Sequence, residues 1–157
     1  MKYARLSKEQ FASLHEEFSF FLASQSIDKK QWAKIKKENP ILTDDLLDLF
    51  SDMVWDISLE KITFLENRSD HHLFLFKCLD NCIDLILIQL DASCPSLKEE
   101  DYKNWLAEHW TDPKVSFFES SRKFYQDFKK EKFKLVRQGA LVIEGTIFED
   151  IKKNLSK

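Results

Sequence analysis

Glycine and proline are scarce in this sequence, with two glycines and three prolines among 157 residues. Few glycines leave few positions at which the backbone can adopt a positive φ at low cost. We therefore expect short loops and regular elements that fill most of the chain. The length is typical of one domain and sufficient to bury a core without cross-links, so we predict a single domain over residues 1–157.

The chain also lacks a strong net charge, an even set of cysteines and a long hydrophobic run. A net charge of −3 provides no general attraction to nucleic acid or to anionic membranes. Three cysteines suit a reducing compartment better than a disulfide framework. The longest aliphatic run, Leu85–Ile88, is far shorter than the ~20 residues that cross a bilayer. The first residues lack the apolar core of a signal peptide. We therefore expect a cytoplasmic protein with no membrane partner.

Hydrophobic spacing and capping residues predict three helices in the first 60 residues. Ser7 with Gln10 forms a capping box, and a second helix begins near Asp28 with Gln31 in the same relation. Thr43 is the predicted start of the third helix. The apolar stripe of this third helix, which we expect to face the core, comprises Leu46, Leu49, Phe50, Met53, Val54 and Ile57.

The middle of the chain changes to strand patterns. The runs 73–76 and 83–90 flank a turn sequence at 79–82, which predicts a β-hairpin. Because both runs are apolar at successive positions, we expect both faces of the hairpin to be covered. Further helices are predicted from Ser96 and from Ser120 or Ser121, with a third strand at 115–118 and a short one at 141–143. The predicted fold class is α+β, with amino-terminal helices, a small, mostly antiparallel sheet built on the 73–90 hairpin, and further helices packed on it.

Cysteines and histidines gather between residues 71 and 94, where a zinc site is the first hypothesis to test. Structural zinc favours pairs such as Cys-x2-Cys at the tip of a knuckle. With a two-residue turn, Leu79 would pair with Cys82, and Cys78 would point to the opposite face of the sheet. The sequence therefore predicts buried thiols, no metal and no cofactor.

Carboxylates recur at every fourth residue along the third predicted helix, and like charges at this spacing mildly destabilise a helix. Trp55 and Leu59 project among them, on the side opposite the apolar stripe. One interpretation is a solvated face with Trp55 tucked under a neighbouring element. The other is a docking surface for a basic partner, anchored by Trp55. The candidate partner-binding residues on this side are Asp44, Asp48, Asp52, Trp55 and Leu59.

A basic and aromatic segment follows later, with seven basic and two acidic residues between positions 122 and 137. Basic residues with interspersed aromatics can bind RNA or single strands. A solvated helix face that balances the acidic segment 38–70 explains the same pattern. The candidate partner-binding residues here are Arg122, Lys129, Lys130, Lys132 and Phe133.

Catalytic signatures are missing from the sequence. It contains no glycine-rich phosphate loop, no Gly-x-Ser-x-Gly elbow and no His-Glu-x-x-His pair. We therefore assign no catalytic residue and lean against an enzyme, although a site assembled from distant residues stays an alternative.

Six stretches spread along the chain carry a resemblance to a known family. They are Leu49-Phe-Ser-Asp-Met-Val-Trp-Asp, Phe64-Leu-Glu-Asn-Arg-Ser, Leu85-Ile-Leu-Ile, Asn104-Trp-Leu, Ser120-Ser-Arg-Lys-Phe-Tyr and Gln138-Gly-Ala-Leu-Val. Together they resemble a family of small cytosolic proteins of unknown function from flavobacteria and related bacteria. The resemblance implies a stand-alone cytoplasmic bacterial domain and names no activity.

The sequence leads first to a non-enzymatic protein–protein interaction domain that binds another protein through its acidic or its basic surface. The first alternative is an enzyme or small-molecule binder with a site near the sheet. The second is an RNA-binding accessory protein that uses residues 122–137.

Overall fold

The computed structural model describes residues 1–156. The chain divides into two compact units, Met1–Glu60 and Lys61–Lys157. The whole is an α+β protein, which confirms the predicted fold class. The single-domain assignment over residues 1–157 stays a prediction. Within residues 1–156, none of the helices combines the length and the apolar character of a membrane span.

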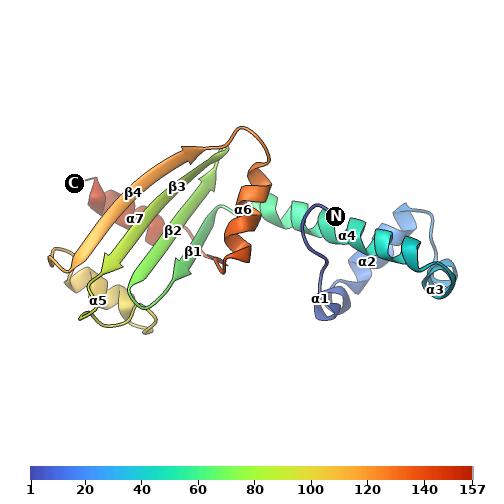
Figure 1. The fold of residues 1–157 in the computed structure, drawn as a ribbon, viewed down its shortest axis with the longest axis horizontal. Coiled ribbons are helices and arrows are strands. Elements are labelled where there is room, and N and C mark those ends of the chain that lie inside the picture. The colour runs from blue at the N-terminus through green and yellow to red at the C-terminus, as the bar shows by residue number, and fades with distance from the viewer. Residues whose placement is uncertain (157) are drawn as a thin grey trace. The chain divides into compact units, whose positions relative to one another are not determined.

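The first unit is helical (Figure 1). Its helices are α1 (Lys8–Ser13), α2 (His15–Ser24), α3 (Lys29–Glu38) and α4 (Pro40–Lys61), whose last residue already belongs to the second unit. Both predicted capping boxes are present at the starts of α1 and α3. The predicted start of the third helix at Thr43 is wrong. Asn39 caps α4 instead, because its side-chain oxygen accepts a hydrogen bond from the Leu42 amide at 3.1 Å, with Pro40 in the first turn.

Aromatic rings fill the core of the first unit. The ring of Phe50 on α4 is fully buried, and the centroids of Phe18, Phe21 and Phe11 lie 5.0, 5.4 and 5.9 Å from it. Leu6, Leu22 and Leu46 complete the cluster. The short helices α1, α2 and α3 therefore bury one side of the much longer α4.

The predicted core stripe of α4 is wrong at three positions. Leu49, Met53 and Ile57 are 52%, 38% and 52% exposed, whereas Trp55, predicted on the opposite side, packs against the core cluster. Three short helices cannot surround a helix of 22 residues. Part of its apolar surface is therefore left facing solvent.

The second unit is built on a five-stranded antiparallel sheet in the order β4-β3-β2-β1-β5. Its strands are β1 (Phe64–Arg68), β2 (His72–Leu79), β3 (Cys82–Leu90), β4 (Val115–Lys123) and β5 (Leu141–Val142). The predicted hairpin is confirmed, with Leu79 opposite Cys82 and Cys78 opposite Ile83. Asp80 and Asn81 form its turn with φ values of 53° and 58°, a conformation that Asp and Asn tolerate well.

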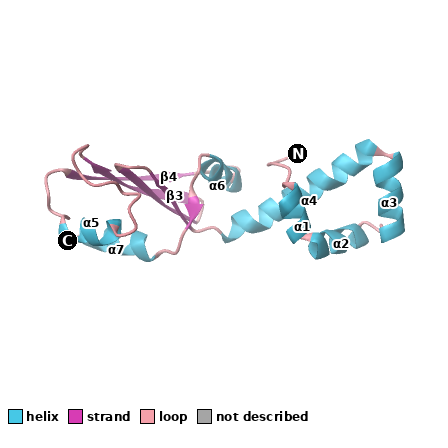
Figure 2. Ribbon diagram, turned by 90° about the horizontal axis from the view of Figure 1, so that it is seen from below, coloured by secondary structure: helices cyan, strands magenta, loops and turns pink. Residues whose placement is uncertain are grey.

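Helices cover the two faces of this sheet unequally. Figure 2 shows α5 (Tyr102–Glu108) and α7 (Thr146–Leu155) on one face and α6 (Phe128–Arg137) on the other. The core lies under α5 and α7, where Leu73, Leu75, Ile86 and Ile88 are buried with Phe148. On the other face Phe118 is 52% exposed, and Phe74 and Leu87 are only partly buried. The expectation that both faces are covered is therefore wrong for part of this face.

The third strand is longer than predicted. β4 continues through Ser120 and Ser121, which pair with Leu85 and Asp84 on β3 and do not cap a helix. The following helix, α6, begins only at Phe128, and α5 begins at Tyr102, well after Ser96.

Candidate protein-binding surfaces

The first six residues, here called the strap (Met1–Leu6), lie along the acidic side of α4. The Asp52 carboxylate accepts hydrogen bonds from the Lys2 amide at 2.6 Å and the Tyr3 amide at 2.9 Å. The indole Nε1 of Trp55 donates to the Ala4 carbonyl at 3.0 Å. The Leu6 amide donates to the hydroxyl of the buried Ser51 at 3.1 Å, and the Leu6 side chain enters the core. Main-chain contacts thus fix the strap on α4.

Basic and phenolic side chains of the strap contact three further carboxylates of α4, those of Asp44, Asp48 and Asp56. Arg5 donates to Asp48 at 2.7 Å and to Asp44 at 3.2 Å. Its hydrogen bond to Asp48 raises the pKa of the Arg5 guanidinium. The Tyr3 hydroxyl donates to Asp56 at 2.6 Å, and burial together with this bond raises the Tyr3 pKa. Ion pairs this exposed contribute only about 0–1 kcal/mol each, so the main-chain bonds and Leu6 hold the strap.

The carboxylates spaced by four along α4, here called the carboxylate ladder (Asp44, Asp48, Asp52 and Asp56), therefore have a basic partner within the chain itself. Asp44, Asp48 and Asp52 bind the strap, and Trp55 binds its backbone. Their binding of a second protein stays a prediction. The prediction that Leu59 binds a partner is wrong, because its side chain is fully buried and offers no surface to a partner.

A second side of α4 carries the apolar ridge, defined as Leu42, Leu49, Met53 and Ile57. All four side chains are between 37% and 52% exposed. They lie close together because residues 7, 4 and 4 positions apart project to neighbouring directions on a helix. Helical phase puts Asp45, Asp56 and Glu60 beside the ridge. The surface is therefore an apolar strip with an acidic border.

The basic segment is divided between two elements of the second unit. Arg122 lies on β4, with its guanidinium 5.0 Å from the ring centroid of Phe124. Lys129, Lys130, Lys132 and Phe133 lie on α6. The prediction that Lys132 binds a partner is wrong, because this residue is 5% exposed and its ammonium group donates to the Ile62 carbonyl at 2.8 Å. Phe133 is partly buried, with the Arg137 guanidinium 5.9 Å from its ring centroid. The residues predicted to bind RNA therefore lie on two different elements, and one of them is buried, so they do not form one continuous basic surface.

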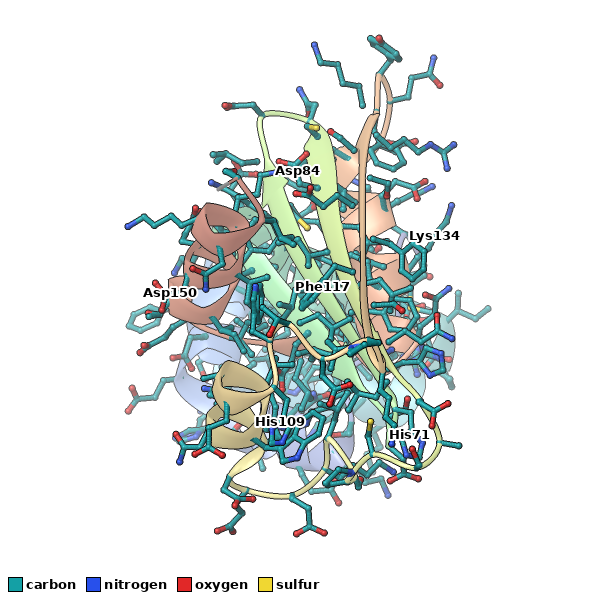
Figure 3. The ribbon with its side chains drawn as sticks, turned by 90° about the vertical axis from the view of Figure 1, so that its left-hand side faces the viewer. His71, Asp84, His109, Phe117, Lys134 and Asp150 are labelled. Carbon is teal, nitrogen blue, oxygen red and sulfur yellow. The ribbon has the colours of Figure 1, made fainter. Side chains whose placement is uncertain are left out.

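A groove of about 520 Å³ runs between α5 and α7. Leu106, Trp110, Ile147 and Ile151 form its apolar lining, and Lys103, Asp150 and Lys153 contribute charged groups. Figure 3 looks at this side of the unit and marks Asp150 on α7 and His109, the residue that follows α5. The volume suits a small molecule.

The cysteines and histidines do not converge. Cys78 is buried, and burial raises the pKa of its thiol to about 11. His71 makes a hydrogen bond of 3.2 Å to the Cys94 carbonyl. Among residues 1–156, no group of three or more His, Cys, Asp or Glu side chains is placed to hold a metal ion. The expectation of no bound zinc stays a prediction.

Sequence reasoning missed two features of α4, although signals for both were present. The strap contains two basic residues, Lys2 and Arg5, which can complement the carboxylates of α4. The apolar stripe of α4 extended over more turns than three short helices can bury.

The fold defines an α+β protein with a helical unit and an antiparallel-sheet unit. The chain belongs to a family of unknown function, DUF6495, whose model matches residues 1–156 and so includes the described part of both units. No curated protein and no solved structure matches the chain significantly. The family establishes kinship and leaves the activity to be inferred from the surfaces.

Proposed function

We propose that this protein is a non-enzymatic interaction domain whose apolar ridge binds an amphipathic helix of another protein. The single observation that carries the proposal is the exposure of Leu49, Met53 and Ile57 on one side of α4. Contiguous apolar side chains on a folded surface mark interaction sites. Helix-in-groove recognition uses anchors at this spacing.

Charge complementarity selects the kind of helix. α4 carries six carboxylates and one lysine, and the strap adds Lys2 and Arg5. The ridge is therefore bordered by net negative charge. A partner helix with Lys or Arg on both sides of its apolar stripe would complement this border, whereas an acidic helix would be repelled.

Two synthetic helical peptides of about 20 residues test the proposal, because that length spans about 30 Å, close to the length of α4. Both carry one leucine stripe; one has lysine borders and the other glutamate borders. We expect fluorescence anisotropy to show binding of the lysine peptide and at least a tenfold weaker binding of the glutamate peptide, a difference of about 1.4 kcal/mol or more. Met53→Glu should abolish binding.

Leu79→Glu is the matched control, since Leu79 is an apolar side chain that is 50% exposed in the second unit. It should bind the lysine peptide like the wild type. Equal binding of the two peptides, or binding that Met53→Glu leaves unchanged, would refute ridge recognition.

The groove between α5 and α7 favours a second candidate function, the binding of a small amphipathic acid. Its apolar lining would hold the hydrocarbon body, and Lys103 or Lys153 would meet the carboxylate. Titration with a medium-chain fatty acid, followed by amide NMR, should shift signals of α5 and α7. Ile147→Trp should fill the groove and remove these shifts. Shifts that persist in this variant, or none at all, would exclude this ligand class.

We also propose a cytoplasmic, bacterial setting. All three cysteines are free thiols, as a reducing compartment favours, and the sequence resemblance points to bacteria. Fractionation of cells that express a tagged chain should recover it with the cytosol. Recovery from the periplasm would contradict the proposal.

A further inference from the structure

We propose that β4 pairs with β4 of a second copy of this chain, so that two five-stranded sheets join into one antiparallel sheet across a two-fold axis. In the described part of the chain, β4 is a terminal strand of the sheet and pairs only with β3 over its nine residues. Figure 1 shows it along the outer edge. This inference is independent of the ridge.

The outer edge of β4 presents backbone groups that can pair with another strand. Beyond the two ends of β4, the Asp91 amide donates to the Lys114 carbonyl at 3.0 Å, and the Phe124 amide donates to the Asn81 carbonyl at 2.8 Å. Even-numbered residues therefore turn their backbone groups toward β3, and odd-numbered residues turn theirs outward. Within residues 1–156, no other segment pairs with this edge. The row from Val115 to Lys123 is thus open.

Natural edge strands are protected by prolines, bulges, short length or central lysines. β4 has none of these. Its register with β3 is continuous, it contains no proline, and its basic residues Arg122 and Lys123 stand at one end. Glu119 is its one acidic residue and pairs with Lys152 at 2.7 Å. The opposite edge of the sheet, β5, has only two residues. Such an unprotected edge is expected to be occupied.

The side chains of β4 favour a second copy as the occupant. Pairing centred on Ser120 places Phe118 of each strand opposite Arg122 of the other, a cation–π arrangement made twice by the symmetry. It places Glu119 opposite Ser121, so no like charges face each other within the strand. Phe118, which is 52% exposed in a single copy, would be covered. Centring on Glu119 would instead oppose the two carboxylates, which is unfavourable.

Sedimentation analysis at about 50 µM protein, far above a micromolar dissociation constant, tests the pairing. We expect a dimer. Ser121→Pro removes an outward amide and should weaken dimerisation at least about tenfold. Phe118→Lys leaves the backbone intact and opposes a lysine to Arg122, so it should have the same effect even where the proline variant fails to fold. Leu79→Lys, on an exposed site outside β4, is the matched control and should remain dimeric.

Oxidative cross-linking tests the register. In a background with Cys82 and Cys94 replaced by Ser, Ser120→Cys should form a disulfide-linked dimer, because the two side chains face each other at the axis. Ser116→Cys should not, since its partner position is 124. A monomeric wild type, a dimer that survives both edge variants, or a dimer lost on Met53→Glu would overturn the proposal. The last result would place the second copy on the ridge.

Discussion

Replacing Asp52 by Asn is the perturbation that best measures what the strap contributes to the first unit. Asp52 accepts two backbone amides, at 2.6 and 2.9 Å. Hydrogen bonds to a charged group contribute about 1.5–3 kcal/mol when well shielded. An amide side chain keeps one acceptor oxygen and turns a donor toward the other N–H. We expect the free energy of unfolding to fall by about 1–2 kcal/mol, because Asp52 is partly exposed.

The opposing effect is smaller. Removing the charge of Asp52 relieves repulsion from Asp48 and Asp56, by about 0.2–0.5 kcal/mol for each pair. A sequence argument from like charges alone therefore predicts that the variant is as stable as the wild type or more so. The hydrogen-bond argument and the like-charge argument therefore predict changes of opposite sign in the free energy of unfolding of the Asp52→Asn variant.

A urea titration followed by far-ultraviolet circular dichroism measures the difference. Asp44→Asn is the matched control, because Asp44 is 61% exposed and its carboxylate accepts a hydrogen bond from the Arg5 side chain at 3.2 Å. It should change the free energy of unfolding by less than about 1 kcal/mol. An Asp52→Asn midpoint equal to or above that of the wild type would refute the strap argument.

Four further predictions concern the second unit and the whole chain. Burial raises the Cys78 pKa from 9.0 to about 11, so the folded state binds this proton more tightly than the unfolded state. The resulting stabilisation is complete below pH 9 and is lost as the pH rises toward 11; urea midpoints of Cys78→Ala should fall less steeply over this range than those of the wild type. Gly145→Ala should lower the free energy of unfolding by about 1–3 kcal/mol in a urea titration, because a Cβ there would overlap the Phe64 ring, and Phe64→Leu should restore part of the loss. Elemental analysis of protein purified without chelator should find no stoichiometric zinc. Calorimetry should show one cooperative transition if the two units fold as the predicted single domain; two resolved transitions would contradict it.

Local signals predicted much of this fold correctly. The capping boxes at Ser7 and Asp28 are present, because each depends on residues three positions apart. The hairpin register from Leu79 and Cys82 is correct for the same reason, since a two-residue turn fixes the pairing of its strands. Features that depend on sequence neighbours were therefore accessible.

Features that depend on distant partners were not. Periodicity indicates that Leu49 and Phe50 lie on a broad apolar stripe, but only the number and length of the covering helices decide which of them is buried. The sequence leaves two interpretations of Trp55, and the structure agrees with the one in which a neighbouring element covers its ring. Periodicity does not identify that element, because the Ala4 carbonyl that accepts from the indole is 51 residues away. The strand character of Ser120 and Ser121 likewise comes from pairing with β3, which overrides their preference for helix caps.

The strap also has a kinetic consequence. Its hydrogen bonds to α4 join residues 39 to 54 positions apart, whereas β2 and β3 are connected by a two-residue turn. Closing the longer loop costs more entropy before any contact forms, so the hairpin has the advantage in the order of folding and the strap docks late. In local unfolding we expect the reverse order, with the strap detaching first. The strap can detach while the helices stay folded, and the amides of Lys2, Tyr3 and Leu6 should exchange with solvent faster than those in the middle of α4. Trypsin should then cut the native protein first after Lys2 and Arg5.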